Sequence, residues 1–335
     1  MNTAERLQKY YDFDETVLGS VAEAAADQNL HNFAELADMY GVADGTDRVV
    51  MPDTGKAIEV LTLKPTGDYD EHEACVYHQA YGAGIDKNAA MHAIRLFGAD
   101  PTRQLVVFGG ATAVGNNAGR LPAAKSLVMY RTQTLNPLVR PSLQYLQDQA
   151  ITATSHFGYS AGADKVVTAI GMSAEHGQTV SRGVAIEPVS LVRRGLPGLA
   201  RDFASTREQQ RRYITQTGSA PYQEIWDEDS FAQMAKFSAG LLRMTNLATA
   251  SVLAQGGFGK RLDAALCNQL TAKLTVGWGT KSELVDNNKA IDTVLDAQAA
   301  YGICRLAVMR LRGMHHAGVD DIDLHAAMML QGERL

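Results

Sequence analysis

From residue 74 onward the chain repeats one unit: a short apolar run, a glycine-bearing loop and a helical segment. Short runs of this kind are typical of strands buried on both faces, and their alternation with helical segments predicts parallel strand pairing. The expected fold is therefore an α/β protein, a mostly parallel sheet flanked by helices. The runs are ACVYHQAYGAG, QLVVFGG, TATSHFGYSAG, GVAIEPVS, AKLTVGWG and CRLAVMRL.

Other segments frame this alternation. The first 40 residues are rich in Ala, Leu, Glu and Gln, which favours helices, and the two β-rich runs of DRVVMPDTGKAIEVLTLKP predict an antiparallel hairpin. The strand signal is absent from Leu196 to Leu270, where the sequence is helix-like. We expect an N-terminal helical arm, a first part of the core, an inserted helical cap or lid, and a second part of the core, at 1–40, 41–195, 196–270 and 271–335.

The sequence GYSAG stands where the third apolar run ends and a helix begins. Gly158 and Gly162 permit a sharp turn that exposes Ser160, the arrangement of a nucleophile elbow. The helix N-terminus would direct the N–H of Ala161 toward a developing oxyanion. The alternative interpretation is that the glycines only ease the turn and that Ser160 caps the helix.

A nucleophilic serine needs a base, and a histidine pair follows the last apolar run. His315 and His316 lie at the carboxyl end of a late strand, the edge of the sheet at which Ser160 is also expected. A histidine pair is also compatible with metal binding, but no second ligand cluster accompanies it. We interpret the remaining histidines, including His78 and His156, as polar residues at strand ends.

The order of elements, the GYSAG turn, the late histidine and the helical insert resemble the α/β-hydrolase superfamily over roughly residues 48–330. The resemblance implies a lid or cap over the serine and hydrolysis of ester, thioester, amide or related bonds. It also favours His316 as the base, because Gly313 precedes it by the usual loop spacing, with His315 as the alternative.

The acid of the triad departs from the family pattern. The resemblance places an aspartate in the loop after AKLTVGWG, where this chain has Ser282, with Glu283 beside it. Another place is the end of the preceding strand, where Glu187 interrupts an apolar run and would need a partner such as an imidazole N–H. Glu187 is the expected acid, and Glu283 and Asp286 are the alternatives.

The second oxyanion donor is expected in the loop after the first parallel strand. The family usually has His-Gly before the donating residue, and here Gln79 replaces that glycine after His78. The backbone N–H of Ala80 or Tyr81 is the expected donor, and Ala80 is the first choice.

These residues predict a serine hydrolase, most simply a carboxylesterase or lipase-like acyl hydrolase. Ser160 would attack the acyl carbon, His316 would transfer the proton and Glu187 would orient the imidazole. The expected partner is a small-molecule ester or acyl substrate, with no cofactor and no metal.

Two alternatives stay open. Ser282 and Gln79 depart from the family pattern, so the fold could instead serve as a binding or structural module with a degenerate site. Residues 108–115 are glycine-rich after a strand, which suggests nucleotide binding, but they lack the G-x-G-x-x-G spacing.

Composition excludes other classes. A net charge of −6 and a pI near 5.8 give no basic face for nucleic acid. Cys75, Cys267 and Cys304 are spaced unlike a zinc site or a disulfide framework and are expected to be reduced and buried. No apolar run is long enough for a signal peptide or a membrane span, so a cytoplasmic protein is expected, and a homo-oligomer is possible.

Overall fold

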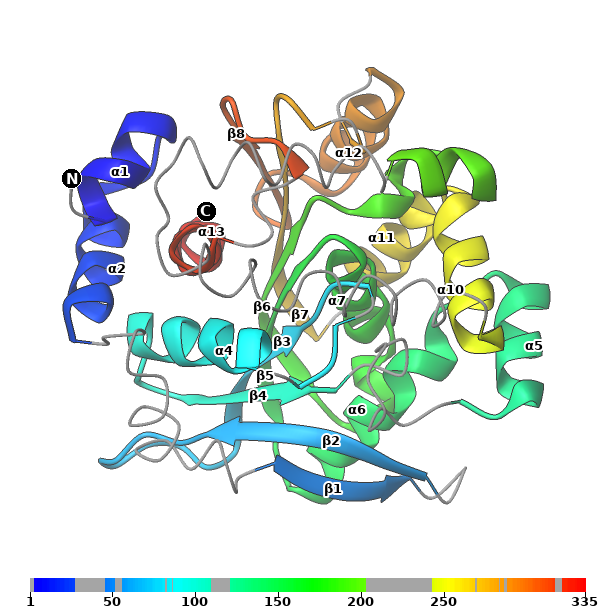
Figure 1. The fold of residues 1–335 in the computed structure, drawn as a ribbon, viewed down its shortest axis with the longest axis horizontal. Helices are drawn as coiled ribbons and strands as arrows, with labels where there is room; N and C mark the ends of the chain where they lie inside the picture. The colour runs from blue at the N-terminus through cyan, green and yellow to red at the C-terminus, as the bar shows by residue number, and fades with distance from the viewer. Residues whose placement is uncertain are drawn as a thin grey trace.

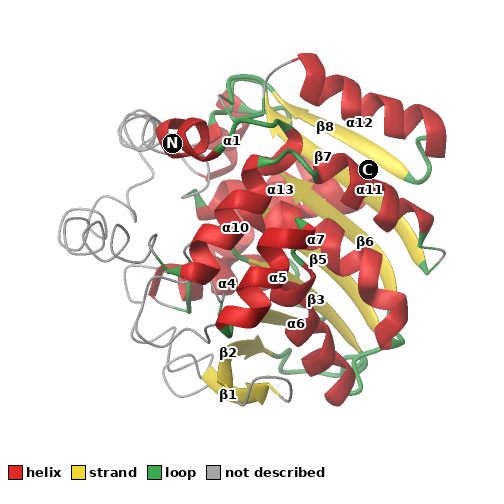
Figure 2. Cartoon of the chain, turned by 90° about the vertical axis from the view of Figure 1, so that its right-hand side faces the viewer, coloured by secondary structure: helices red, strands yellow, loops and turns green. Residues whose placement is uncertain are grey.

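A single sheet runs through the molecule, and helices lie against both of its faces (Figure 1, Figure 2). The structure is a computed structural model. It describes residues 3–27, 46–51, 56–81, 83–85, 87–109, 121–202, 243–268, 270–282, 284–285, 288–316 and 321–335.

The sheet has eight strands within the described residues, in the order β1-β2-β4-β3-β5-β6-β7-β8. The β1–β2 and β2–β4 pairs are antiparallel, and all the other neighbouring pairs are parallel. The predicted mostly parallel sheet is therefore confirmed, and the predicted hairpin is the β1–β2 pair. The strands are β1 (Thr46–Met51), β2 (Lys56–Leu63), β3 (Glu73–His78), β4 (Gln104–Phe108), β5 (Ala153–Tyr159), β6 (Thr179–Ile186), β7 (Thr271–Gly279) and β8 (Leu306–Leu311).

The helices form two layers. Helices α1, α2, α4 and α13 share one hydrophobic cluster on one face, and α6, α7, α11 and α12 cover the other face (Figure 1). Helix α10 packs on α5 beyond the second layer. The helices are α1 (Thr3–Tyr10), α2 (Glu15–Asp27), α4 (Lys87–Ala99), α5 (Ala123–Thr132), α6 (Asn136–Asp148), α7 (Ala161–Met172), α10 (Met244–Ala254), α11 (Phe258–Cys267), α12 (Asn288–Tyr301) and α13 (Ile322–Arg334).

Burial on both faces explains the unbroken apolar runs of the sequence. In β6, Val184 and Ile186 pack into the cluster beneath α13, whereas Ala185 between them packs into the cluster beneath α7. Successive side chains of a strand point to opposite faces, so a strand covered on both sides is apolar at most positions. Strands of this kind hold their carboxyl ends at a fixed edge of the sheet, where Ser160 follows β5.

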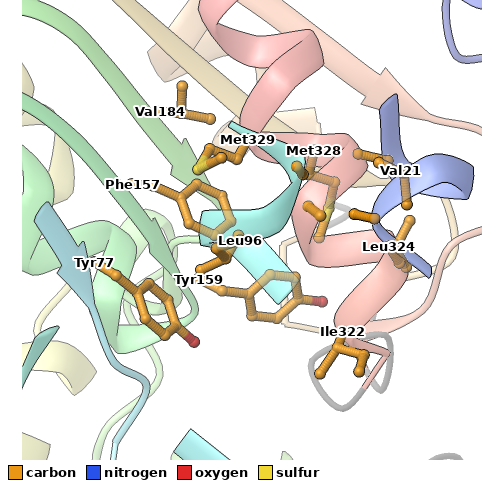
Figure 3. Packing of buried hydrophobic residues seen from close by; sticks show 14 of the residues in the cluster. Val21, Tyr77, Leu96, Phe157, Tyr159, Val184, Ile322, Leu324, Met328 and Met329 are labelled. Carbon is orange, nitrogen blue, oxygen red and sulfur yellow. The ribbon is translucent and has the colours of Figure 1, made fainter. Parts of the chain in front are cut away.

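Aromatic rings fill the first face next to the serine. Tyr77 of β3 and Phe157 of β5 stack with their centroids 5.7 Å apart, and Tyr159 lies beside them (Figure 3). His325 of α13 stacks on Tyr159 at 4.8 Å and lies 4.7 Å from His92 of α4. The core beside the elbow therefore includes imidazole rings as well as hydrocarbon.

The N-terminal helices are tied to the C-terminal helix. The Arg6 guanidinium of α1 pairs with Asp321, 315 residues away, and donates to Asp323 at 2.9 Å. Asp321 also caps α13 by accepting the N–H of Leu324 at 3.1 Å. The described part of the expected helical arm thus packs into the first face of the sheet.

The expected cap falls largely on residues that the structure does not describe, 203–242. Of the described helices in that region, α11 places Phe258 and Leu262 in one cluster with Val166 of α7. The division of the chain into arm, core and cap stays a prediction.

The cysteines differ partly from expectation. Cys75 is a buried free thiol, whereas Cys267 and Cys304 are free and exposed, so their predicted burial was wrong. Cys267 is the last residue of α11 and contacts the hydroxyl of Tyr301, 3.3 Å from its sulfur. Cys304 lies in the turn before β8. A single exposed thiol adds little apolar surface, so burial was not required.

Four of the buried histidines pack within or against the strands: His78 and His156 stack on each other, and His92 and His325 pack against the aromatic rings of the first face. Burial lowers the pKa of His92 to about 4 and that of His156 to about 3, and it lowers the pKa values of the other two well below 6.5. Both ring nitrogens of His325 lack a hydrogen-bond partner among the described residues.

We predict that His325→Phe raises the free energy of unfolding, and by more at pH 5 than at pH 8. Below a pH of about 6.5, the ordinary pKa of histidine, His325 binds a proton only in the unfolded chain. Proton binding therefore stabilises the unfolded chain, and the free energy of unfolding decreases as the pH falls. At pH 5 this linkage amounts to about 2 kcal/mol. Urea unfolding at the two pH values measures it.

Met328→Leu, a buried change on the same helix, is the matched control and should have the same effect at both pH values. The smaller variant His325→Leu guards against overpacking. An equal effect of either His325 variant at both pH values would contradict the prediction.

Candidate active site

The turn between β5 and α7 presents Ser160. Its backbone has φ 59° and ψ −126°, a conformation that side-chain-bearing residues rarely adopt. Backbone strain of this kind persists only where the surroundings enforce it, and it gathers at functional sites. Ser160 itself is only 3% exposed. The predicted elbow is thus present at the predicted residue.

The two glycines of GYSAG are required by close backbone approaches. A Cβ added at Gly158 would lie 2.5 Å from the backbone of Gly162, and a Cβ added at Gly162 would lie 2.0 Å from the carbonyl oxygen of His78. Real Cβ atoms essentially never approach so closely. The first turn of α7 therefore sits directly on the end of β3 and on the loop that follows it.

His316 connects the serine to an acid. Its Nε2 lies 3.0 Å from Ser160 Oγ, and its Nδ1 lies 2.9 Å from Glu187 Oε2. The hydroxyl of Tyr159 donates to the His316 carbonyl oxygen at 3.0 Å and so fixes the loop that carries the imidazole. The structure therefore brings Ser160, His316 and Glu187 together; it is His316, and not His315, that contacts the serine.

Glu187 reaches this position through an unusual backbone. It follows β6 with φ 57°, and its N–H donates to Gly277 O of β7 at 2.8 Å. The side chain is fully buried and accepts from the N–H of Gly279 at 2.5 Å. This turn carries a carboxylate from the end of β6 to the end of β7, where the family resemblance places the acid.

Ser282 is the residue whose role the sequence did not indicate. Its hydroxyl donates to Glu187 Oε2, the same oxygen that lies next to His316 Nδ1. The Gly279 N–H, the Ser282 hydroxyl and the His316 Nδ1 thus surround the Glu187 carboxylate. These three hydrogen-bond partners offset the cost of burying its charge. The sequence signal that could have indicated this role is a hydroxyl residue at the position where the family has an aspartate. Glu283 and Asp286 lie outside the described residues.

The backbone N–H groups of the two predicted oxyanion donors, Ala161 and Ala80, have no acceptor among the described residues. Ala161 N–H opens α7 and therefore has no partner within the helix. Ala80 lies two residues after β3, and its N–H donates to no acceptor within the part of the chain that the structure describes. Their assignment as oxyanion donors stays a prediction.

A buried ion pair joins the serine's helix to the acid's loop. Asp164 of α7 accepts from Ser190, three residues after Glu187, through both the hydroxyl and the backbone N–H. Arg261 of α11 donates to Asp164 at 2.7 Å. Because Asp164 is fully buried and Arg261 is nearly so, this network fixes α7 against the β6 loop.

Most of the glycine-rich segment 108–115 lies outside the described residues, so nucleotide binding there is not tested. Its described part ends at Gly109, whose N–H donates to Glu59 O at 2.7 Å. Within the described residues no group of three or more His, Cys, Asp or Glu side chains is placed to hold a metal ion. A helix long and apolar enough to cross a membrane is likewise not found among them.

The fold was compared with those of known proteins. No family model and no curated protein matches the sequence. Among solved structures, an α/β-hydrolase enzyme from a Medee basin deep-sea metagenome library is similar with a TM-score of 0.54 and 12% identity, over 84% of this chain and 95% of that one. N-formylmaleamic acid deformylase from Pseudomonas putida has a TM-score of 0.53 and 13% identity, over 84% and 99%.

An enol-lactonase from Burkholderia xenovorans is similar with a TM-score of 0.52 and 10% identity, over 85% of this chain and 98% of that one. Identities this low relate the proteins by fold alone. The strand order, the strained turn at Ser160 and these structural likenesses together show that the chain has the α/β-hydrolase fold.

Proposed function

We propose that the protein is a serine hydrolase that cleaves small carboxylic esters, or closely related acyl substrates, through an acyl-enzyme. The observation that carries the proposal is the continuous chain from Ser160 Oγ through His316 to Glu187, with contacts of 3.0 and 2.9 Å. Proteins of the same fold include an enol-lactonase and a deformylase, which is consistent with this class of reaction.

The contacts support one assignment of the protons. A carboxylate only accepts hydrogen bonds, so the Nδ1 of His316 carries the hydrogen that faces Glu187. Nε2 is then the acceptor for the hydroxyl of Ser160. In this tautomer the imidazole is ready to act as a general base, and Glu187 stabilises the imidazolium that forms.

The reaction then has two halves. Ser160 Oγ bonds to the carbonyl carbon while its proton passes to His316 Nε2, and the carbonyl oxygen takes the negative charge. When the intermediate collapses, the bond to the alcohol breaks and His316 returns the proton to that alcohol. Water repeats the sequence on the acyl-enzyme, which releases the acid and restores Ser160. The N–H groups of Ala161 and Ala80 bind the oxyanion in both halves.

We predict that a fluorophosphonate probe labels the wild-type protein at Ser160 and that Ser160→Ala is not labelled. The same variant should lower kcat for p-nitrophenyl acetate by about 10⁶-fold, because the nucleophile is absent. Mass spectrometry of the labelled peptide identifies the modified residue. A folded wild-type protein that takes no label would contradict the hydrolase proposal and support the alternative, a binding module.

The role of Glu187 is tested by Glu187→Gln, which keeps the length of the side chain but removes the carboxylate. We expect kcat to fall by about 10³–10⁴-fold, since the imidazole loses its orientation and the imidazolium its counter-charge. Steady-state hydrolysis of p-nitrophenyl acetate measures the loss. A decrease of less than about tenfold in a folded variant would remove Glu187 from the triad.

A relocated acid provides a sharper test. Ser282 contacts the same carboxylate oxygen as His316, so Ser282→Asp should bring a carboxylate toward Nδ1. We expect the double variant Glu187→Asn with Ser282→Asp to be at least about tenfold more active than Glu187→Asn alone; asparagine suits the positive φ. Ser282→Asp alone is the control and should lose activity, since two buried carboxylates then repel each other. No recovery in a folded double variant would refute the equivalence of the two positions.

A further inference from the structure

A buried lysine lies behind the proposed active site. Lys165 is on α7, five residues after Ser160, and only 8% of it is exposed. Its Nζ donates to the carbonyl oxygen of Gln79 at 2.9 Å, and this carbonyl is the only acceptor of Nζ among the described residues. None of the proposed proton-transfer steps uses this ammonium group.

Burying the ammonium group of Lys165 costs free energy unless it is compensated by the groups around it. Burial lowers the pKa of Lys165 from 10.5 to about 8, although the adjacent carboxylate of Asp164 opposes this shift. A buried cation is stabilised only by the groups that it meets, and here the acceptor is a peptide carbonyl. The contact is therefore informative about that peptide.

The peptide in question joins Gln79 to Ala80. A trans peptide is planar, with its C=O and N–H pointing in opposite directions, and the described chain contains no cis bond. Holding the Gln79 carbonyl on Lys165 therefore turns the Ala80 N–H away from the lysine. It also keeps that carbonyl, whose negative end would repel an oxyanion, from rotating into the site.

We propose that Lys165 is a positioning residue that holds the Gln79–Ala80 peptide with the Ala80 N–H set as the second oxyanion donor. This inference rests on the proposed hydrolase function. Among the described residues Lys165 makes no hydrogen bond to Ser160, His316 or Glu187, so it would act through the peptide alone.

The surroundings support this role. The first turn of α7 meets the His78 carbonyl so closely that only glycine fits at position 162. With its amide nitrogen toward the loop, the Gln79 side chain donates to the carbonyl oxygens of Ala83 at 3.3 Å and Gly84 at 2.9 Å. Helix α7 thus presents the nucleophile and the Ala161 N–H and also fixes the peptide that carries the Ala80 N–H.

A charge-assisted hydrogen bond adds a pH dependence. Above a pH of about 8 Lys165 loses its proton, the bond to Gln79 O weakens, and kcat/KM should fall. The other ionisable groups around it are Asp164, paired with Arg261, and the histidines His78 and His156. Burial keeps both imidazoles neutral at this pH, so they add no step of their own.

The test compares Lys165→Met, which removes the donor, with Lys165→Gln, which keeps a neutral donor. With p-nitrophenyl acetate, Lys165→Met should lower kcat by about 10–100-fold with KM changed by less than about threefold. A trifluoromethyl ketone, whose adduct with Ser160 carries the oxyanion, should bind the variant about 10–100-fold more weakly. The kcat and the inhibitor affinity of Lys165→Gln should lie between those of the wild type and those of Lys165→Met. Both variants should lose the decline in kcat/KM above pH 8.

Thr168→Val is the matched control, because Thr168 is buried on the same helix and its hydroxyl donates to Asp164 O, whereas it makes no hydrogen bond to the loop after β3 among the described residues. It should lower stability without changing kcat, inhibitor affinity or the alkaline pH profile. If Lys165→Met does not fold, Lys165→Gln and the wild-type pH profile decide the question.

The outcomes separate the two proposals. If the wild type is labelled by fluorophosphonate but a folded Lys165 variant keeps kcat, inhibitor affinity and pH profile within about twofold, the role of Lys165 is wrong and the hydrolase stands. If the wild type is not labelled, both proposals are wrong. An equal loss in Thr168→Val would assign the effect to helix stability and would also overturn the inference.

Discussion

The close packing of three backbone segments is the constraint on which the geometry of the candidate active site depends. The end of β5, the first turn of α7 and the carbonyl at the end of β3 approach one another so closely that glycine is required at positions 158 and 162. This packing forces Ser160 into a strained conformation and holds its side chain at the edge of the sheet. The cost of such strain is borne by the buried strands and helices around it. A rigid parallel core is therefore what allows a single serine to be held in this unfavourable geometry.

The proposed acid shows how a carboxylate from another strand can reach the same histidine nitrogen. Glu187 belongs to β6, but its positive φ and its bonds to Gly279 and Ser282 bring the carboxylate to the end of β7. The longer glutamate side chain reaches from the end of β6 to His316, whereas an aspartate at position 282 would start closer to the imidazole. What the imidazole requires is a carboxylate beside Nδ1, and here a glutamate that follows β6 occupies that place, with its oxygen atoms hydrogen-bonded by Gly279 and Ser282.

The sequence predicts the elements and contacts that depend on local pattern. The alternation of apolar runs, glycine loops and helical segments predicts the parallel sheet, and GYSAG at a strand-to-helix junction predicts the turn at Ser160. Glu187 could be identified because a charged residue stands in an otherwise apolar run. Ser282 and Lys165 could not be assigned, because their partners are 95 and 86 residues away and no local pattern marks those contacts. The prediction that Cys267 and Cys304 are buried was wrong for a related reason. Composition describes a residue type, whereas exposure depends on where a helix or turn meets the surface.

Two adjacent charged residues of α7 contact two different loops. Asp164 and Lys165 are adjacent in sequence and both are buried, yet each meets a different neighbour: Asp164 the β6 loop and Arg261, Lys165 the loop after β3. The two loops flank the serine, one carrying the acid and the other a proposed oxyanion donor. A helix bearing only apolar residues at these positions would pack as well, but it would leave both loops without a directional contact, since apolar packing fixes a distance and not the rotation of a peptide. The two buried charges thus give the helix that follows Ser160 directional contacts with both loops of the candidate site.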